Sequence, residues 1–261
     1  MRPSLVMASP LPPCITAHDL LKATAVAIMI VDHVGSYFFP ENLWLRAVGR
    51  ASAPIWLFLI GHARGRAVPA NLLLAGAGLV GANALAGLPL LPLPVLFTIA
   101  ATRLALGRVT RAFLKDNDRE KMGIVLAGLA LLALPTSAVA EYGSLGLLFA
   151  LMGTLVRDGV RGATLAATGA AGLVAYCAWN HIVFAFPLAE AALAAVAVAG
   201  ALALLARFRA GTLPALDARL PRPLSALLRL GGRRTLEIYV AHLLVFKAAA
   251  WALSTGPFVS P

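Results

Sequence analysis

The chain has few charged residues and very little cysteine. Only 13% of its 261 residues are Asp, Glu, Lys or Arg, and its two cysteines, Cys14 and Cys177, stand far apart. Two cysteines cannot form the disulfide framework of a small secreted domain or a structural zinc site. So small a charged fraction cannot cover the surface of a soluble domain of this length. The sequence also lacks a glycine-rich phosphate loop, G-x-S-x-G and H-E-x-x-H, which excludes the common soluble catalytic frameworks.

Apolar residues dominate what is present. The hydrophobic fraction is 60%, the mean hydropathy is +0.85, and the apolar runs are continuous rather than alternating with polar residues. This pattern predicts an all-α, polytopic transmembrane helix bundle and not a membrane barrel. Abundant small residues would allow its helices to pack closely. We expect nine spans, at about residues 18–38, 50–64, 69–88, 90–107, 122–140, 143–157, 162–184, 187–206 and 231–253.

The basic residues predict the orientation of the bundle. Lys and Arg number 22 against 11 Asp and Glu, and they gather in every second gap between the apolar runs. The positive-inside rule then places the N-terminus in the cytoplasm and the C-terminus outside. The expected division is a tail over residues 1–17, a membrane domain over 18–253 and an outer tail over 254–261. The basic loops favour contact with anionic membrane lipids, and no nucleic-acid partner is expected.

The first predicted span carries three ionisable residues, Lys22, Asp32 and His33. Each costs about 2.5–3.5 kcal/mol inside a membrane, so a function is the default explanation. Lys22 and His33 are eleven residues apart, which puts them on one helix face about 16 Å apart. Asp32 points about 100° away from His33, toward a neighbouring helix. We expect Asp19, three residues before Lys22, to pair with that lysine.

This arrangement suggests a conduit through the bundle. Lys22 at the cytoplasmic mouth would hold a phosphate-bearing donor, and His33 would act as general base on an acceptor arriving from the other side. The structural alternative is that Lys22 snorkels to the headgroups while Asp32 and His33 form a buried polar cluster.

The sequence "HDLLKATAVAIMIVDHVGSYFF", followed by "WLRAVGRASAPIWLFLIGHARGR", resembles the N-terminal half of the TraX family. The shared pattern is a D-x-x-K start, a D-H pair, R-x-x-G-R and a proline-containing apolar span. The resemblance implies an integral membrane enzyme linked to N-terminal acetylation of F-type pilin. The interval from Lys22 to His33 also resembles a motif of the acyltransferase-3 superfamily, which implies acetyl-CoA as cytoplasmic donor and an acceptor outside. The expected location is therefore the bacterial inner membrane.

The candidate site residues fall into three groups. We expect His33 and Asp32 to be catalytic. The coenzyme A phosphates would contact Lys22, Arg64, Arg66, Arg108 and Arg111, although the arginines also fit plain membrane anchors. Arg46 and Arg50 break the charge rule and would orient Asp32, bind the acceptor or stabilise an oxyanion. "RRTLEIYVAHLLVF" is similar to the closing helix of the family, and its Tyr239 and His242 would complete the acceptor site or serve packing. No metal is expected.

Three functions remain open at this point. The first is a membrane acetyltransferase that moves an acetyl group from acetyl-CoA to an exported protein N-terminus, such as pilin, or to a sugar hydroxyl. The second is a small proton-coupled transporter with Asp32, His33 and His242 as its relay, although no inverted repeat supports it. The third is a non-catalytic membrane partner of a secretion apparatus.

Overall fold

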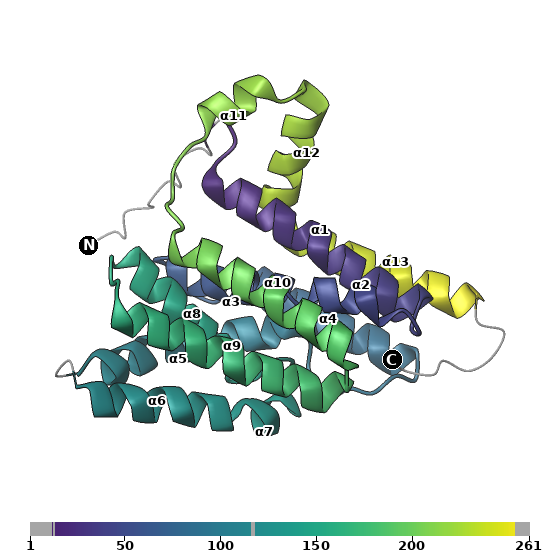
Figure 1. Ribbon diagram of the computed structural model, residues 1–261. Helices are drawn as coiled ribbons and strands as arrows, with labels where there is room; N and C mark the ends of the chain where they lie inside the picture. Colours follow the sequence, from purple (N-terminus) through teal and green to yellow (C-terminus); the bar gives the residue numbers. More distant parts are fainter. Residues whose placement is uncertain (1–11, 13, 116–117, 254–261) are drawn as a thin grey trace, which may run out of the picture.

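The computed structural model describes residues 12, 14–115 and 118–253. The predicted outer tail and most of the predicted N-terminal tail lie outside these residues. The described chain forms an all-helical bundle (Figure 1). Its helices are α1 (Ala17–Phe38), α2 (Leu43–Gly49), α3 (Ser52–His62), α4 (Ala70–Leu85), α5 (Val95–Leu114), α6 (Arg119–Leu131), α7 (Ala133–Ser137), α8 (Leu145–Arg157), α9 (Ala163–Phe184), α10 (Leu188–Ala206), α11 (Pro214–Arg219), α12 (Arg222–Arg233) and α13 (Thr235–Leu253).

Every one of the nine predicted spans contains a helix, but their bounds differ from the prediction in places. Among the described residues, four segments are long and apolar enough to cross a membrane: α1, Leu43–His62, α10 and α13. The prediction missed α11 and α12, which it treated as loop. It also began the fourth span too early, because the prolines of "GLPLLPLP" keep the helix from starting before Val95. The protein is thus an α-helical protein with membrane-spanning segments.

The first helix starts where its sequence dictates. Thr16 accepts a hydrogen bond from the backbone N–H of Asp19 (3.0 Å), and Asp19 accepts one from the N–H of Thr16 (3.1 Å). This reciprocal capping box satisfies two amide donors that the first helical turn would otherwise leave free. It fixes the register of α1, and therefore the depth of Lys22 and His33 in the bundle.

Helices α3 and α8 form the buried centre of the bundle. Glycines make their close contact possible: a Cβ added to Gly61 would lie 1.7 Å from the backbone oxygen of Ala150, and one on Gly153 would lie 2.0 Å from that of Phe58. Nearly all of α8 is buried, including large side chains such as Phe149. Small residues thus bring two backbones into direct contact, as the composition predicted.

A second layer covers this centre and contains the site. Helix α1 packs against α2, α3, α12 and α13, and α11 and α12 lie above α1 at the top of the view in Figure 1. A smaller apolar cluster joins α1, α4, α5 and α13 through Met29, Leu72, Leu96, Tyr239 and Leu243. This cluster forms part of the wall around the cavity described below.

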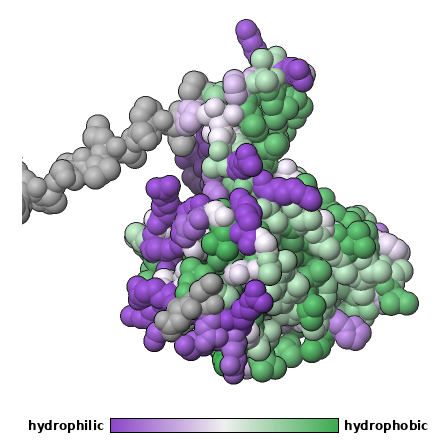
Figure 2. Space-filling view, turned by 60° about the vertical axis from the view of Figure 1, so that its left-hand side comes forward, coloured by the Kyte–Doolittle hydropathy of each residue, from purple (hydrophilic) through white to green (hydrophobic). Residues whose placement is uncertain are grey.

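Hydrophilic side chains gather at one end of the bundle (Figure 2). This is the end at which α3 and α8 finish and α5 passes into α6, and it carries the exposed residues Arg64, Arg108, Arg111, Lys115 and Arg119. Because this basic end is the side predicted to face the cytoplasm, it is called the inner end here, and the opposite end is called the outer end.

Candidate active site

A cavity of about 300 Å³ lies between α1, α3, α4, α5 and α13. Lys22 and His33 both line it, so the two ends of the predicted slot open into one space. Its middle is walled by apolar and aromatic side chains, among them Met29 and Leu96. The cavity is large enough for a small-molecule ligand or for part of a longer one.

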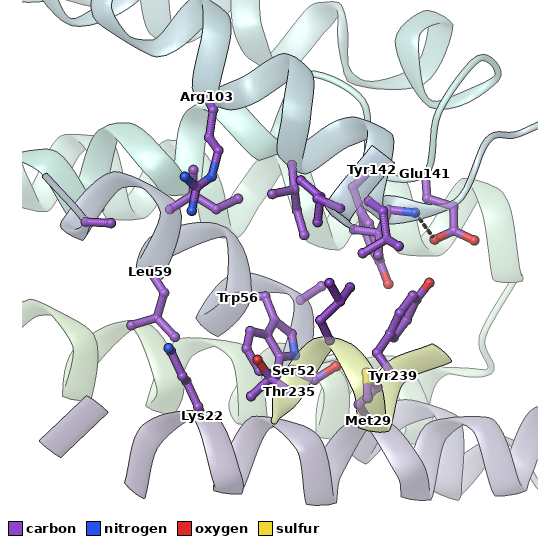
Figure 3. A pocket seen from close by; sticks show the side chains of 18 of the residues that line it. Lys22, Met29, Ser52, Trp56, Leu59, Arg103, Glu141, Tyr142, Thr235 and Tyr239 are labelled. Atoms are coloured by element: carbon purple, nitrogen blue, oxygen red, sulfur yellow. Dashed lines mark hydrogen bonds between the residues drawn. The ribbon is translucent and has the colours of Figure 1, made fainter. Parts of the chain in front are cut away.

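The two ends of the cavity differ in charge. The inner end is lined by Lys22 from α1 and Arg103 from α5, with Leu59 beside the lysine (Figure 3). Glu141, Tyr142 and Tyr239 lie at the opposite end in the same view. The cavity is therefore cationic at its inner end, while its outer end carries carboxylate, phenol and imidazole groups.

His33 contacts His242, which sequence separation alone could not indicate. The Nδ1 atom of His33 lies 2.6 Å from Nε2 of His242, and the two rings are stacked. The Nδ1 atom of His242 lies 2.8 Å from the backbone oxygen of Ile238. A carbonyl only accepts, so His242 Nδ1 carries a proton. With His242 neutral, its Nε2 accepts from His33 Nδ1–H, and the lone pair of His33 is then on Nε2.

This arrangement identifies the partner of the His33 imidazole. His242 orients it, and neither the neighbouring Asp32 nor an arginine does so. Asp32 instead forms a buried ion pair with Arg50 of the α2–α3 junction. The reason is geometric, because Asp32 points away from the His33 face of α1, as predicted from their adjacency.

The R-x-x-G-R segment is built around Asp32. A Cβ at Gly49 would lie 2.2 Å from the Cβ of Asp32, so only glycine allows this approach. Arg46 Nε lies 4.0 Å from Asp32 Oδ1. Both guanidinium groups stack on the Phe184 ring, with Cζ 4.7 Å and 4.6 Å from its centroid. Neither arginine lines the cavity. Arg50 thus holds Asp32 in place and Arg46 lies beside the pair, while the roles of the two arginines in acceptor or oxyanion binding stay predictions.

Lys22 does not pair with Asp19, contrary to our expectation. The Asp19 carboxylate caps α1 and receives a hydrogen bond from Arg233 of α12 (3.1 Å). Gly232 allows this contact, since a Cβ there would lie 2.4 Å from the Asp19 Cα. Lys22 makes no hydrogen bond or ion pair with any described residue, and its side chain lies at the inner end of the cavity (Figure 3).

The four arginines predicted to bind phosphate lie outside the cavity lining. Arg66 donates to the backbone oxygens of Ile60 (2.9 Å) and Gly61 (3.4 Å), and so caps the end of α3. Arg64, Arg108 and Arg111 are exposed at the inner end of the bundle. In the neighbouring loop, a hydrogen bond from Arg157 holds the pKa of Asp158 below its usual value.

Arg103 is the inner-end cation that sequence reasoning missed. Its side chain lines the cavity and donates to the backbone oxygen of Ala67 (2.8 Å), while its buried Nε has no hydrogen-bond partner in the structure. The signal was present, because Arg103 falls inside the fourth predicted apolar run, where a charged residue is rare.

Trp56 and Glu141 were also missed. Trp56 lies in the middle of the cavity wall, and its buried indole Nε1 has no hydrogen-bond partner in the structure. Glu141 lies in the turn before α8, where its Oε2 accepts from Val95 N–H at the start of α5 (2.9 Å). The neighbouring Tyr142 has a φ of 66°, a left-handed conformation that is uncommon for a bulky residue. This turn places both side chains at the outer end of the cavity.

Tyr239 lines the cavity from α13, while His242, one turn later on the same helix, contacts both Tyr239 and His33. The structure thus brings together His33, His242, Tyr239 and the Asp32–Arg50 pair at the outer end. Among the residues that the structure describes, no group of three His, Cys, Asp or Glu side chains could hold a metal ion.

The fold and the site define a helical membrane protein whose internal cavity has ionisable groups at both ends. The family model described as "TraX protein" matches residues 17–216, most of the chain. The chain belongs to the TraX family. It is also 43% identical over 44 residues to a protein of Rickettsia prowazekii (strain Madrid E) named "Uncharacterized protein RP591". That match covers 17% of this chain and only 18% of the relative. No solved structure matches the chain.

Proposed function

We propose that the protein is an integral membrane acetyltransferase that moves an acetyl group from acetyl-CoA to an exported acceptor. One observation carries the proposal: Lys22 and Arg103 at one end and His33 at the other line a single cavity. A cationic end suits the phosphates of coenzyme A, an apolar middle suits the pantetheine arm, and an imidazole at the far end suits proton transfer.

The donor would enter from the cytoplasmic side. In this proposal nine spans place the N-terminus inside the cell, so the inner end of the bundle faces the cytoplasm. Lys22 and Arg103 would bind the phosphates, and the exposed Arg64, Arg108 and Arg111 would attract the anionic donor to the entrance. The bacterial inner membrane is the location that fits a cytoplasmic donor and an exported acceptor.

The chemistry would take place at the outer end. His33 Nε2 would accept the proton of the attacking group, and the ring needs no carboxylate partner because His242 already orients it. As the imidazolium forms, His242 can share its proton through the 2.6 Å contact. The Tyr239 hydroxyl, which lines the cavity, would donate to the oxygen of the tetrahedral intermediate. Asp32 would act indirectly, because Arg50 neutralises it.

The acceptor would arrive from the outer side. Membership of the TraX family favours a protein N-terminus such as that of pilin, and a sugar hydroxyl is the alternative acceptor. Both are nucleophiles that lose a proton on acetylation, so the general-base role of His33 applies to either one.

The direct test uses purified protein in detergent with acetyl-CoA and a short acceptor peptide. We expect acceptor-dependent release of coenzyme A, and we expect His33→Ala to lower kcat by about 100-fold or more, in the range of a lost general base. The matched control is His181→Ala, an exposed histidine of α9, which should retain full activity. Gel-filtration profiles should show that both variants fold. Full activity in His33→Ala would overturn the general-base role.

The stacked pair of His33 and His242 also fits a proton relay in a transporter. The two functions differ in their use of acetyl-CoA, because an acetyltransferase must bind it and a proton-coupled transporter need not. Isothermal titration of the purified protein with acetyl-CoA separates them: saturable binding supports the acetyltransferase, and its absence together with proton uptake in vesicles supports the transporter.

A further inference from the structure

The outer end of the cavity contains two carboxylates, Asp32 and Glu141, in very different surroundings. Asp32 is neutralised by the buried Arg50, and Arg46 also lies near it. Glu141 has no ion-pair partner among the described residues, and its one side-chain hydrogen bond there is from Val95 N–H to Oε2. Of the two, Glu141 is the carboxylate without an ion-pair partner among the described residues, and the charges of Arg50 and Lys247 act on it only at longer range.

The turn that carries Glu141 is held firmly. The Thr98 hydroxyl donates to the backbone oxygen of Glu141 (2.5 Å). The Leu93 N–H donates to the backbone oxygen of Val139 (2.8 Å), and the Glu141 N–H donates to that of Leu93 (2.9 Å). The left-handed Tyr142 follows directly. Such strained backbone persists only where the surroundings fix it, and it is often found at binding sites. The carboxylate is therefore a positioned group at the cavity wall (Figure 3).

We propose that Glu141 is the specificity residue of the acceptor site, where it binds the acceptor's primary ammonium group. This inference rests on the proposed function. Each end of the cavity would then bind a group whose charge is opposite to its own. The anionic donor would lie between Lys22 and Arg103, and the cationic acceptor would lie beside Glu141. A neutral hydroxyl acceptor would leave the partly buried carboxylate without a direct ion-pair partner, which an ammonium group would supply.

The same carboxylate gives the acceptor a route to its reactive form. The ammonium group gives one proton to Glu141 and becomes a neutral amine. The amine nitrogen forms a bond to the acetyl carbonyl carbon and passes its second proton to His33 Nε2. The C–S bond then breaks, and the coenzyme A thiolate takes that proton from His33. Glu141 releases its proton to the outer aqueous side, so the products are an acetylated amine, free coenzyme A and one proton.

A purely structural role for Glu141 makes a different prediction. In that case its only task is to accept the hydrogen bond from Val95 and cap α5. Glu141→Gln separates the two roles, because the glutamine amide oxygen can still accept this bond while the negative charge is gone. Glu41→Gln is the matched control, since Glu41 is exposed in the outer loop before α2.

The experiment uses the full-length protein and two acceptor peptides that differ in one group. One peptide has a free N-terminal amine, and the other has a hydroxyl in its place. For the wild type we expect the amine peptide to be preferred. For Glu141→Gln we expect the KM for the amine peptide to rise at least tenfold, while the acetyl-CoA Kd and the rate with the hydroxyl peptide change less than twofold. Glu41→Gln should behave as the wild type does.

Two results would overturn the assignment of Glu141 while leaving acetyl transfer intact. One is an unchanged KM for the amine peptide in Glu141→Gln, and the other is a wild-type preference for the hydroxyl peptide. A wild-type protein that fails to bind acetyl-CoA and acetylates neither peptide would overturn the proposed function itself, and this inference with it.

Discussion

The two ends of the cavity are built differently. At the outer end, three ionisable groups each have a fixed partner: Asp32 pairs with Arg50, His33 with His242, and Glu141 with Val95 N–H. At the inner end, Lys22 has no partner among the described residues and projects on a flexible stem into the space. A fixed geometry is what a chemical step requires. An adaptable lysine suits the binding of phosphates, whose charge matters more than their exact orientation. In the proposed function, this difference makes the inner end the donor-binding end and the outer end the place of the reaction.

The largest expected effect follows from breaking the outer network at Arg50. Arg50→Ala leaves the buried Asp32 carboxylate without its counter-charge, which typically costs about 3–5 kcal/mol of stability. The measurement is thermal unfolding in detergent, where we expect a clearly lower Tm. Arg108→Ala removes an exposed arginine and should leave the Tm unchanged. Equal Tm values for the two variants would show that the Asp32–Arg50 ion pair does not contribute to the stability of the protein.

A smaller effect is expected at His242. His242→Ala removes the group that holds the His33 ring, so kcat should fall about 10–100-fold, as for other residues that orient a functional histidine. The KM for acetyl-CoA should stay unchanged. His242→Gln should recover part of the activity, because its amide oxygen can accept from His33 Nδ1–H. If kcat for His242→Ala equals that of the wild type, His242 serves packing alone.

The smallest effect is expected at the inner end. Lys22→Ala removes one phosphate contact, so the Kd for acetyl-CoA should rise about tenfold, equivalent to about 1.4 kcal/mol. Lys22→Arg should keep most of the affinity, and added salt should weaken binding to the wild type more than to Lys22→Ala. Acetyl-pantetheine, which lacks the nucleotide phosphates, should bind both proteins equally. A preference of the wild type for acetyl-pantetheine over acetyl-CoA would contradict the phosphate role.

The sequence was most informative where the relevant spacing lies within one helix. The shared face of Lys22 and His33 and the separate direction of Asp32 follow from α-helical geometry, and the structure agrees with both. Small residues also predicted close helix packing, which Gly61 and Gly153 provide. Helix α12 was missed because Pro221 and its arginines resemble a loop when the packing of α12 against α1 is unknown.

Contacts between distant segments could not be predicted in this way. His33 and His242 are 209 positions apart, and nothing local indicates that α1 and α13 bring their rings together. Phosphate binding was assigned to arginines that follow apolar runs on the predicted cytoplasmic side, whereas Arg103 lies inside such a run and lines the cavity. Glu141 depends on the fold of a short turn, which hydropathy does not describe.

The glycine contacts between α3 and α8 have a consequence for how the protein operates. Two backbones that touch at Gly61 and Gly153 cannot slide or rock past each other without a steric clash. One of these helices carries Trp56 and Ser52 of the cavity wall. The α3–α8 pair is therefore a rigid unit, and the part of the cavity wall that it carries keeps its shape while a ligand enters or leaves.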